Sequence, residues 1–355
     1  MKKGKVVIVI LFCLVIILVL FLLFFNKKSI SFSSSVNVVP TLDDKVSSNT
    51  SWCSTFQLVW NDMKNEVVKQ DIVFTPQIEM VKNLNKESFN ESMISDSYYY
   101  KTYGPKTIKL KNEIEKAIKD KFNQESDILD SIDWSDDALT SDNVERYFFY
   151  TMLYREFQYN TKFSILDKSS FGEYKNIKYF GVNSKSNSEV FNQLKVLFYN
   201  SSDDFAVKLI TKDNDEVIFY KNPTGETFNE IYNNMMSKTK AYNGDRNFND
   251  VDSFKAPMID FNIKKEFYEL ENKEFKTYNG TAIIEKAIQT ISFSLDEKGG
   301  RIKSEAAADI MKMSIVENEV RHFDVDSTFA LFLKEKDRDV PYFALLVDDI
   351  TKFQK

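Results

Sequence analysis

The chain has 355 residues, of which 43% are hydrophobic and 14% aromatic, and this composition excludes intrinsic disorder over most of its length. Its net charge of −6 gives no general attraction to nucleic acid, which is therefore not an expected partner. Two cysteines and one histidine are too few for a disulfide framework, or for a zinc site of four cysteines or of two cysteines and two histidines.

The first predicted element is an unbroken apolar run at residues 6–25. A helix of 20 residues is about 30 Å long, which matches the hydrocarbon core of a bilayer. A cleaved signal peptide is the alternative, but the run exceeds a usual signal core and no small-x-small cleavage site follows it. We therefore predict a signal-anchor over residues 1–25, single-pass in the cell membrane. Lysines on both sides favour a cytoplasmic N-terminus only mildly, and this orientation places the C-terminal domain outside the cytoplasm.

The anchor is followed by a serine-rich segment at residues 26–51, which has little hydrophobic periodicity and is predicted to be a flexible linker. From Trp52 to the C-terminus no further serine- or proline-rich break occurs. We therefore predict one folded domain over residues 52–355.

The first part of this domain shows helical spacing. Residues 52–70 and 110–122 place apolar side chains three and four positions apart, as an amphipathic helix does. Between them, residues 72–74 are predicted to form a short strand. Thr75 and Pro76 are then expected to open a further helix.

Beyond residue 144 the pattern becomes typical of strands, because aromatic and β-branched runs alternate with short polar turns. A helix is predicted at residues 228–236. The predicted strands lie at residues 205–210, 217–220, 256–263, 290–295, 329–333 and 342–347. Helices first and mostly antiparallel strands later predict an α+β fold.

Familiar catalytic and metal patterns are weak in this chain. A Ser-His-Asp or Cys-His centre would need His322, which stands beside an apolar strand start and fits a structural role better. Residues 213–216 resemble part of a calcium loop but lack the glycine and the distal glutamate of an EF-hand, so a solvated turn is preferred. Asp133, Asp136 and Asp137 could provide an acid-base pair, but they equally suit a helix N-terminus. We expect no enzyme activity, no metal and no cofactor.

The most informative stretch is residues 291–308, which read ISFSLDEKGGRIKSEAAA. This strand, acidic-glycine hinge and run of small residues resemble the reactive-centre loop of serpins, whose usual hinge reads Glu-Glu-Gly-Thr-Glu-Ala-Ala-Ala. Residues 323–333 and 340–347 resemble the strands that follow the loop in that family. Residues 85–142 are shorter than their counterpart in a full-length serpin, so the chain resembles a divergent member.

Two further segments bear on this resemblance. Residues 71–76 resemble the family's shutter strand and Ser-Pro helix start, which would make Thr75 and Pro76 shutter residues. Near the point where the loop inserts, serpins usually carry a glycine and a tryptophan, whereas Phe157 and Tyr159 stand here. The resemblance implies a serpin-like fold, with helices packed on mostly antiparallel sheets and an exposed loop.

The function implied by the resemblance is that of a suicide substrate, cleaved by a serine or cysteine protease in a loop around residues 297–323. The family's usual loop length, counted from Glu297, places the reactive bond between Met313 and Ser314, with the bond from Lys312 to Met313 as the alternative. The hinge would consist of Glu297, Gly299, Gly300, Ile302, Ser304, Ala306 and Ala308. An elastase-, subtilisin- or trypsin-like partner and a monomer are expected. The alternative is a non-inhibitory serpin-like domain with a binding or structural role outside the cytoplasm.

Strand periodicity tests the loop physically, because an inserted strand points every second residue to one face. One such face, formed by the even-numbered residues of 300–310, carries no charge, whereas the other carries two cations and two carboxylates. Insertion is therefore allowed in one register only. Residues 304–313 also fit a capped helix, and the bulk of Arg301 and Ile302 should slow insertion.

Overall fold

The computed structural model describes residues 35–126, 128–134, 147–183, 186, 188–278, 280–300 and 320–354. Ser33–Lys355 form one compact unit, which contains all of these residues. The apolar run at residues 6–25 lies outside the described residues. Within them, no helix has the length and hydrophobicity needed to cross a membrane.

The largest sheet has seven strands, and its middle strands are buried completely. In spatial order the strands are β1 (Asn37–Val38), β2 (Thr50–Cys53), β19 (Phe343–Val347), β18 (Phe329–Glu335), β10 (Asp215–Lys221), β9 (Asp204–Ile210) and β8 (Leu194–Ser201). All pairs are antiparallel except β1 with β2. Every residue of β10 and β18 is buried, because apolar runs without alternation suit a strand that is covered on both faces.

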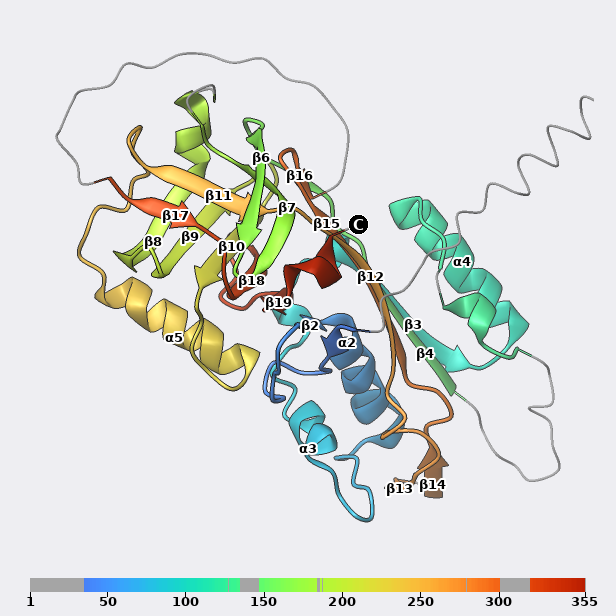
Figure 1. Ribbon diagram of the computed structural model, residues 1–355. Coiled ribbons are helices and arrows are strands. Elements are labelled where there is room, and N and C mark those ends of the chain that lie inside the picture. The colour runs from blue at the N-terminus through green and yellow to red at the C-terminus, as the bar shows by residue number, and fades with distance from the viewer. Residues whose placement is uncertain are drawn as a thin grey trace, which may run out of the picture. The chain divides into compact units, whose positions relative to one another are not determined.

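A second sheet of four strands packs against the first (Figure 1). Its order is β17 (His322–Asp324), β11 (Ser253–Pro257), β7 (Tyr174–Gly181) and β6 (Ser164–Phe171). Phe254 of β11 lies 6.2 Å from Phe219 of β10, and Phe171 of β6 lies 5.9 Å from Phe329 of β18, measured between ring centroids. Aromatic packing between these two sheets forms the centre of the core.

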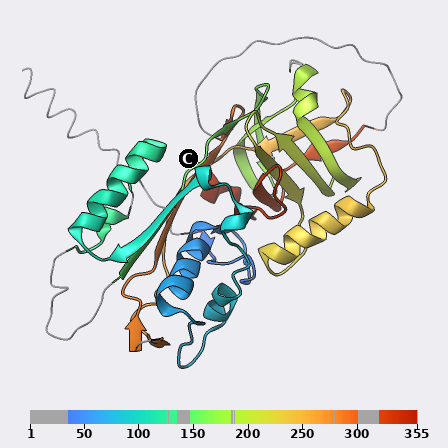
Figure 2. The same cartoon turned by 180° about the vertical axis from the view of Figure 1, so that it is seen from behind.

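The remaining strands form short pairs. β3 (Tyr99–Pro105) pairs with β4 (Tyr147–Leu153), β12 (Ile259–Glu266) with β15 (Ile288–Leu295), and β13 (Glu274–Thr277) with β14 (Gly280–Ile283), all antiparallel. β5 (Phe157–Gln158) and β16 (Gly299–Gly300) form a further two-stranded sheet. The β3–β4 and β12–β15 pairs lie side by side in both views (Figures 1 and 2).

Four α-helices of the described part of the chain flank these sheets: α2 (Thr55–Asp62), α3 (Glu79–Asn85), α4 (Ile108–Phe122) and α5 (Phe228–Ala241). A π-helix, Met63–Val68, continues α2, and 3-10 turns lie at Glu91–Met93, Asp96–Tyr98, Leu129–Ser131, Ser188–Gln193 and Ile350–Phe353. Helix α2 contacts β3 and β4. Helix α4 buries Leu110, Ile114 and Ile118 in a separate cluster that includes Tyr150 of β4. The α+β class is therefore confirmed, with the predicted helices over residues 110–122 and 228–236 in place.

Two sequence-based boundaries are corrected by the structure. The folded domain begins before residue 52, because Val36, Val38 and Leu42 are buried in its core, so residues 36–51 are not a linker. The first helix starts at Thr55, since Trp52 and Cys53 belong to β2. Residues 36–42 belong to a segment whose sequence lacks a clear hydrophobic period, and Trp52 and Cys53 come before the periodic apolar positions of the helix, which start at Phe56. Only their packing reveals where these residues belong.

The strand predicted at residues 72–74 is wrong. Side-chain amides take the hydrogen bonds that a neighbouring strand would have made: Asn85 donates from Nδ2 to the Ile72 carbonyl at 2.8 Å, and Gln77 Oε1 accepts from the Phe74 amide at 3.0 Å. The following helix, α3, begins at Glu79 rather than at Pro76.

Candidate hinge of the reactive loop

The chain reverses direction immediately after β15. Asp296 and Gly299 exchange backbone hydrogen bonds of 3.0 and 3.4 Å, and the Asp296 carboxylate accepts from the Lys298 amide at 2.8 Å. β16 then pairs antiparallel with β5, with Gly299 opposite Gln158 and Gly300 opposite Phe157. The segment predicted to be the hinge thus starts as a strand beside the end of β15.

Both glycines of β16 are required by the space around them. Gly299 has a φ of +137°, and a Cβ atom there would lie 2.3 Å from the Phe157 carbonyl oxygen. A Cβ atom at Gly300 would lie 2.7 Å from Cζ of the Phe157 ring. Glycine alone fits a positive φ at such an approach of two backbones. The glycines therefore allow β16 and β5 to pair.

The residues next to β16 are tied to the segment after β5. Glu297 is buried, its carboxylate lies 3.3 Å from the Lys162 ammonium, and its carbonyl accepts from the Phe163 amide at 2.9 Å. The Tyr159 amide donates to the Lys298 carbonyl at 3.0 Å. Tyr159 is 3% exposed and burial raises its pKa well above the usual value. Tyr159, which we expected near the insertion point, does lie against the hinge.

Two strands next to β5 and β16 are paired on one edge only. Among the described strands, β4 pairs with β3 alone and β15 with β12 alone, so each keeps one edge without a strand partner. Helix α2 joins both pairs from beneath: it contacts β4, and Gln289 of β15 donates to the Cys53 carbonyl at 3.0 Å and to the Thr55 hydroxyl at 2.8 Å. These two edges could receive one more strand.

The far end of the loop is anchored where the described chain resumes. Arg321 is buried, and its Nη2 lies 2.7 Å from Asp252 Oδ2 while Nε lies 3.2 Å from Asp252 Oδ1. Its guanidinium also donates to the Asp245 and Asn247 carbonyls, both at 2.6 Å. His322 follows on β17 and is exposed, with Nδ1 2.9 Å from the Ser253 hydroxyl. β17 is thus held independently of the hinge.

Several predicted site residues lie outside the described residues: Ile302, Ser304, Ala306, Ala308, Lys312, Met313 and Ser314. Thr75 and Pro76 are exposed in the segment before α3. Because residues 72–74 are not a strand, the pattern behind their shutter assignment is absent. A strand that leads directly into a helix occurs instead at β2 and α2.

The other candidate sites are structural. The turn between β9 and β10 lies at residues 211–214, so the solvated turn predicted at residues 213–216 is only half right: Asp215 and Glu216 belong to β10 and are buried, and Asp215 is ion-paired with Arg155. Burial raises the pKa of Asp215 more than Arg155 lowers it. No cluster of potential metal ligands occurs among the described residues. Asp136 and Asp137 lie outside them. The Arg155–Asp215 pair was missed by the sequence reasoning, since nothing in either segment indicates the other.

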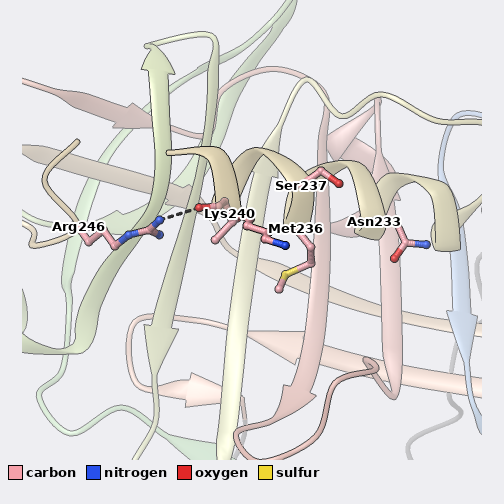
Figure 3. A pocket seen from close by; sticks show the side chains of 6 residues that line it. Asn233, Met236, Ser237, Lys240 and Arg246 are labelled. Atoms are coloured by element: carbon pink, nitrogen blue, oxygen red, sulfur yellow. Dashed lines mark hydrogen bonds between the residues drawn. The ribbon is translucent and has the colours of Figure 1, made fainter. Parts of the chain in front are cut away.

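A shallow pocket runs along the outer face of α5 (Figure 3). It is lined by Asn233, Met236, Ser237, Thr239, Lys240 and Arg246. Arg246 has protein hydrogen-bond partners, because its guanidinium donates to the Thr239, Tyr242 and Leu197 carbonyls at 2.6 to 2.9 Å. Arg246 therefore caps the C-terminal end of α5, and the pocket contains neither a carboxylate nor a histidine.

No protein-family model and no curated protein matches the chain. Solved structures to which it is similar are serpins. Serpin48 from the insect Tenebrio molitor is 13% identical over 72% of this chain and 78% of that one, with a TM-score of 0.42. SRPN18 from Anopheles gambiae is 8% identical over 73% and 78%, with a TM-score of 0.43. Thyroxine-binding globulin in complex with thyroxine is 16% identical over 67% of this chain, with a TM-score of 0.40, and the match spans 63% of that protein.

Proposed function

We propose that the chain is a membrane-tethered, serpin-like inhibitor that traps a serine or cysteine protease. The observation that carries the proposal is β16, because Gly299 and Gly300 leave β15 through a tight turn and already pair with β5. In this position β16 contacts β15 and pairs with β5, which follows β4 in the chain, and β4 and β15 each have one edge without a partner strand among the described strands. A chain that continued in the same direction would become a strand between them.

The protease supplies the catalysis in this mechanism. Its serine or cysteine attacks the carbonyl carbon of Met313, the bond to Ser314 breaks, and the leaving amine takes up a proton. The new ester or thioester joins the protease to the end of the hinge segment. If that segment inserts before the bond is hydrolysed, the protease is carried along and its active site is deformed. If hydrolysis is faster, the chain is consumed as a substrate.

The strand lengths support insertion. β4 has seven residues and β15 has eight, so a segment such as residues 300–310 is long enough to pair with both. Each neutral hydrogen bond gained would contribute roughly 0.5 to 1.5 kcal/mol. Burial of Ile302 would add about 1.5 to 3 kcal/mol. We assign the driving force for insertion of the cleaved loop to these hydrogen bonds and to this burial.

The tether is part of the proposal. If the apolar run at residues 6–25 is retained, Asn37 of β1 follows it after 11 residues, which span at most about 40 Å when fully extended. The inhibitory domain would then work close to the outer face of the membrane, on proteases that reach the cell surface.

An adduct assay tests the proposed function. The full chain in detergent is mixed separately with elastase-, subtilisin- and trypsin-like proteases, and the products are separated on a denaturing gel. We expect an SDS-resistant adduct of protease and chain with at least one class, and its loss when the catalytic serine of that protease is replaced. Cleavage by all three classes without any adduct would contradict inhibition and favour the non-inhibitory binding role.

A further inference from the structure

Four short motifs in the chain read Asn-x-Ser or Asn-x-Thr without proline at the middle position. They begin at Asn49, Asn90, Asn200 and Asn279. This is the acceptor pattern for N-linked oligosaccharides, which are attached to proteins outside the cytoplasm at asparagines on the surface. Asn279 lies outside the described residues. For the other three motifs, the surroundings of the asparagine decide which one can carry a glycan.

The motif at Asn49 is packed into the protein. Asn49 Oδ1 accepts from the backbone amides of Asp348 and Asp349 at 2.9 and 2.8 Å. Thr50 and Ser51, which complete the motif, belong to β2 and are both 0% exposed. A glycan on Asn49 would have to fit against a buried strand, so Asn49 is a poor acceptor.

The motif at Asn90 is held against the body of the domain. The Asn90 side chain is half-buried, and its Oδ1 accepts from the Ser92 amide at 3.0 Å and from the Ser92 hydroxyl at 2.6 Å. The Ser92 carbonyl in turn accepts from Arg338 Nη1 at 2.7 Å. This loop therefore leaves less room for a glycan than an exposed turn does.

Asn200 occupies the most open position of the three. It lies near the end of β8, and all three residues of its motif are exposed. Tyr199 pairs with Phe205 and Ser201 with Asp204, so Asn200 is the extra residue of a β-bulge and has no residue opposite it on β9. β8 is also the outermost strand of the seven-stranded sheet among the described strands (Figure 1). An oligosaccharide on Asn200 would displace no described strand.

The hydrogen bond that holds the Asn200 side chain is compatible with an attached sugar. Asn200 Nδ2 donates to Asp204 Oδ2 at 2.9 Å, and Asp204 Oδ1 lies 2.8 Å from the Lys238 ammonium. A side-chain amide has two N–H groups, and the bond to Asp204 needs only one. The other can be replaced by a bond to the sugar, so the contact with Asp204 would survive and orient the linkage.

We propose that Asn200 is the attachment site of an N-linked oligosaccharide. This assignment rests on one part of the proposed function, the location of the domain outside the cytoplasm, and does not depend on protease inhibition. In the transfer, Asn200 Nδ2 forms a bond to the anomeric carbon of the first sugar of a lipid-linked donor. The bond from that carbon to the pyrophosphate of the donor breaks, the pyrophosphate leaves with the electron pair, and the amide gives up one proton to a base of the transferase.

Site mapping tests the assignment. The full chain is produced in a eukaryotic cell line that attaches N-linked oligosaccharides, and it is extracted from the membrane fraction in detergent. Enzymatic release of glycans in water enriched in heavy oxygen turns each glycosylated asparagine into a labelled aspartate, which mass spectrometry locates. We expect the label at Asn200 and none at Asn49. Ser202→Ala and Asn200→Gln should each abolish the label at residue 200, whereas Ser202→Thr keeps the required hydroxyl and should retain it.

A matched control lies beside the same turn. Asn222 donates from Nδ2 to the Asp203 carbonyl at 2.8 Å, and its motif, Asn222-Pro223-Thr224, is blocked by the proline at the middle position. The peptide that contains Asn222 should therefore stay unlabelled. Equal labelling of Asn222 and Asn200 would show that the label reports spontaneous deamidation, and it would overturn the assignment.

An added acceptor separates this inference from the proposed function. Glu274→Thr completes a motif at Asn272, and both of these positions are exposed. If Asn272 is labelled in this variant while Asn200 is not, the domain has crossed the membrane and only the assignment of Asn200 is overturned. If neither asparagine is labelled, the domain has stayed in the cytoplasm, which overturns the outward topology of the proposed function together with the assignment.

Discussion

Replacing Gly299 with alanine is the most direct perturbation of the hinge. The added methyl group would lie 2.3 Å from the Phe157 carbonyl oxygen and 2.8 Å from the Gln158 Cα atom. Both are backbone atoms, so the clash cannot be relieved by a side-chain rotation. The φ of +137° is in addition a conformation that alanine rarely adopts. We expect β16 to detach from β5 in Gly299→Ala.

The expected loss of stability in Gly299→Ala is set by the contacts that β16 gives up when it leaves β5. If β16 stayed paired, an alanine at the positive φ of residue 299 would be strained by about 1 to 3 kcal/mol. Loss of about two backbone hydrogen bonds then costs roughly 2 kcal/mol. Unfolding entropy of about 2.1 cal/mol/K per residue gives roughly 0.7 kcal/mol/K for a unit the size of Ser33–Lys355. The intact protein should therefore unfold about 3 °C lower.

Thermal unfolding followed by circular dichroism measures this change, with two other glycines as controls. Gly172 has a φ of +51° but nothing within 4 Å of an added Cβ atom, and Gly280 has neither a positive φ nor a close neighbour. Gly172→Ala isolates the effect of φ, whereas Gly280→Ala should be nearly neutral. If Gly299→Ala lowers the midpoint no more than Gly172→Ala does, the close packing of β16 on β5 is not what holds the hinge.

Cleavage in the loop should raise the unfolding midpoint above that of the intact chain, because a new strand gains hydrogen bonds and buries Ile302. Ile302→Asp should abolish this gain, whereas Lys303→Asp should not. An unfolding midpoint that stays the same or falls when the wild-type chain is cleaved would refute insertion. Burial raises the pKa of Asp44 above its usual 3.8, against hydrogen bonds from Asn83 and Thr41 that lower it. The contribution of Asp44 to stability is complete below a pH of 3.8 and is lost as the pH rises through the raised pKa of the folded state. The free energy of unfolding of the wild-type chain in urea should therefore exceed that of Asp44→Asn by less as the pH rises through this range. A difference that stays constant or grows would contradict the direction of the pKa shift. N-terminal sequencing of the membrane fraction should recover residues 6–25, whereas a mature chain that begins near residues 29–36 would rule out the anchor.

Local pattern determined much of what the sequence predicted correctly. The helix at residues 110–122 and the hairpin of β9 and β10 each carry a clear hydrophobic period and a recognisable start or turn, and the structure has both. The strand at residues 72–74 shows the limit of this reasoning, because Asn85 and Gln77 satisfy its backbone groups without any partner strand. A short apolar run is compatible with either outcome.

At the predicted hinge, the resemblance to serpins pointed to Glu297, Gly299 and Gly300, because an acidic residue followed by glycines between a strand and small residues is a local pattern. Only the tertiary structure shows that these glycines pack on Phe157, 142 residues earlier in the chain than Gly299, and that β4 and β15 each keep a free edge among the described strands. It alone also brings Arg155 to Asp215. Such pairings depend on which buried surfaces meet when the sheets pack, and a local pattern carries no information about a partner that is distant in sequence.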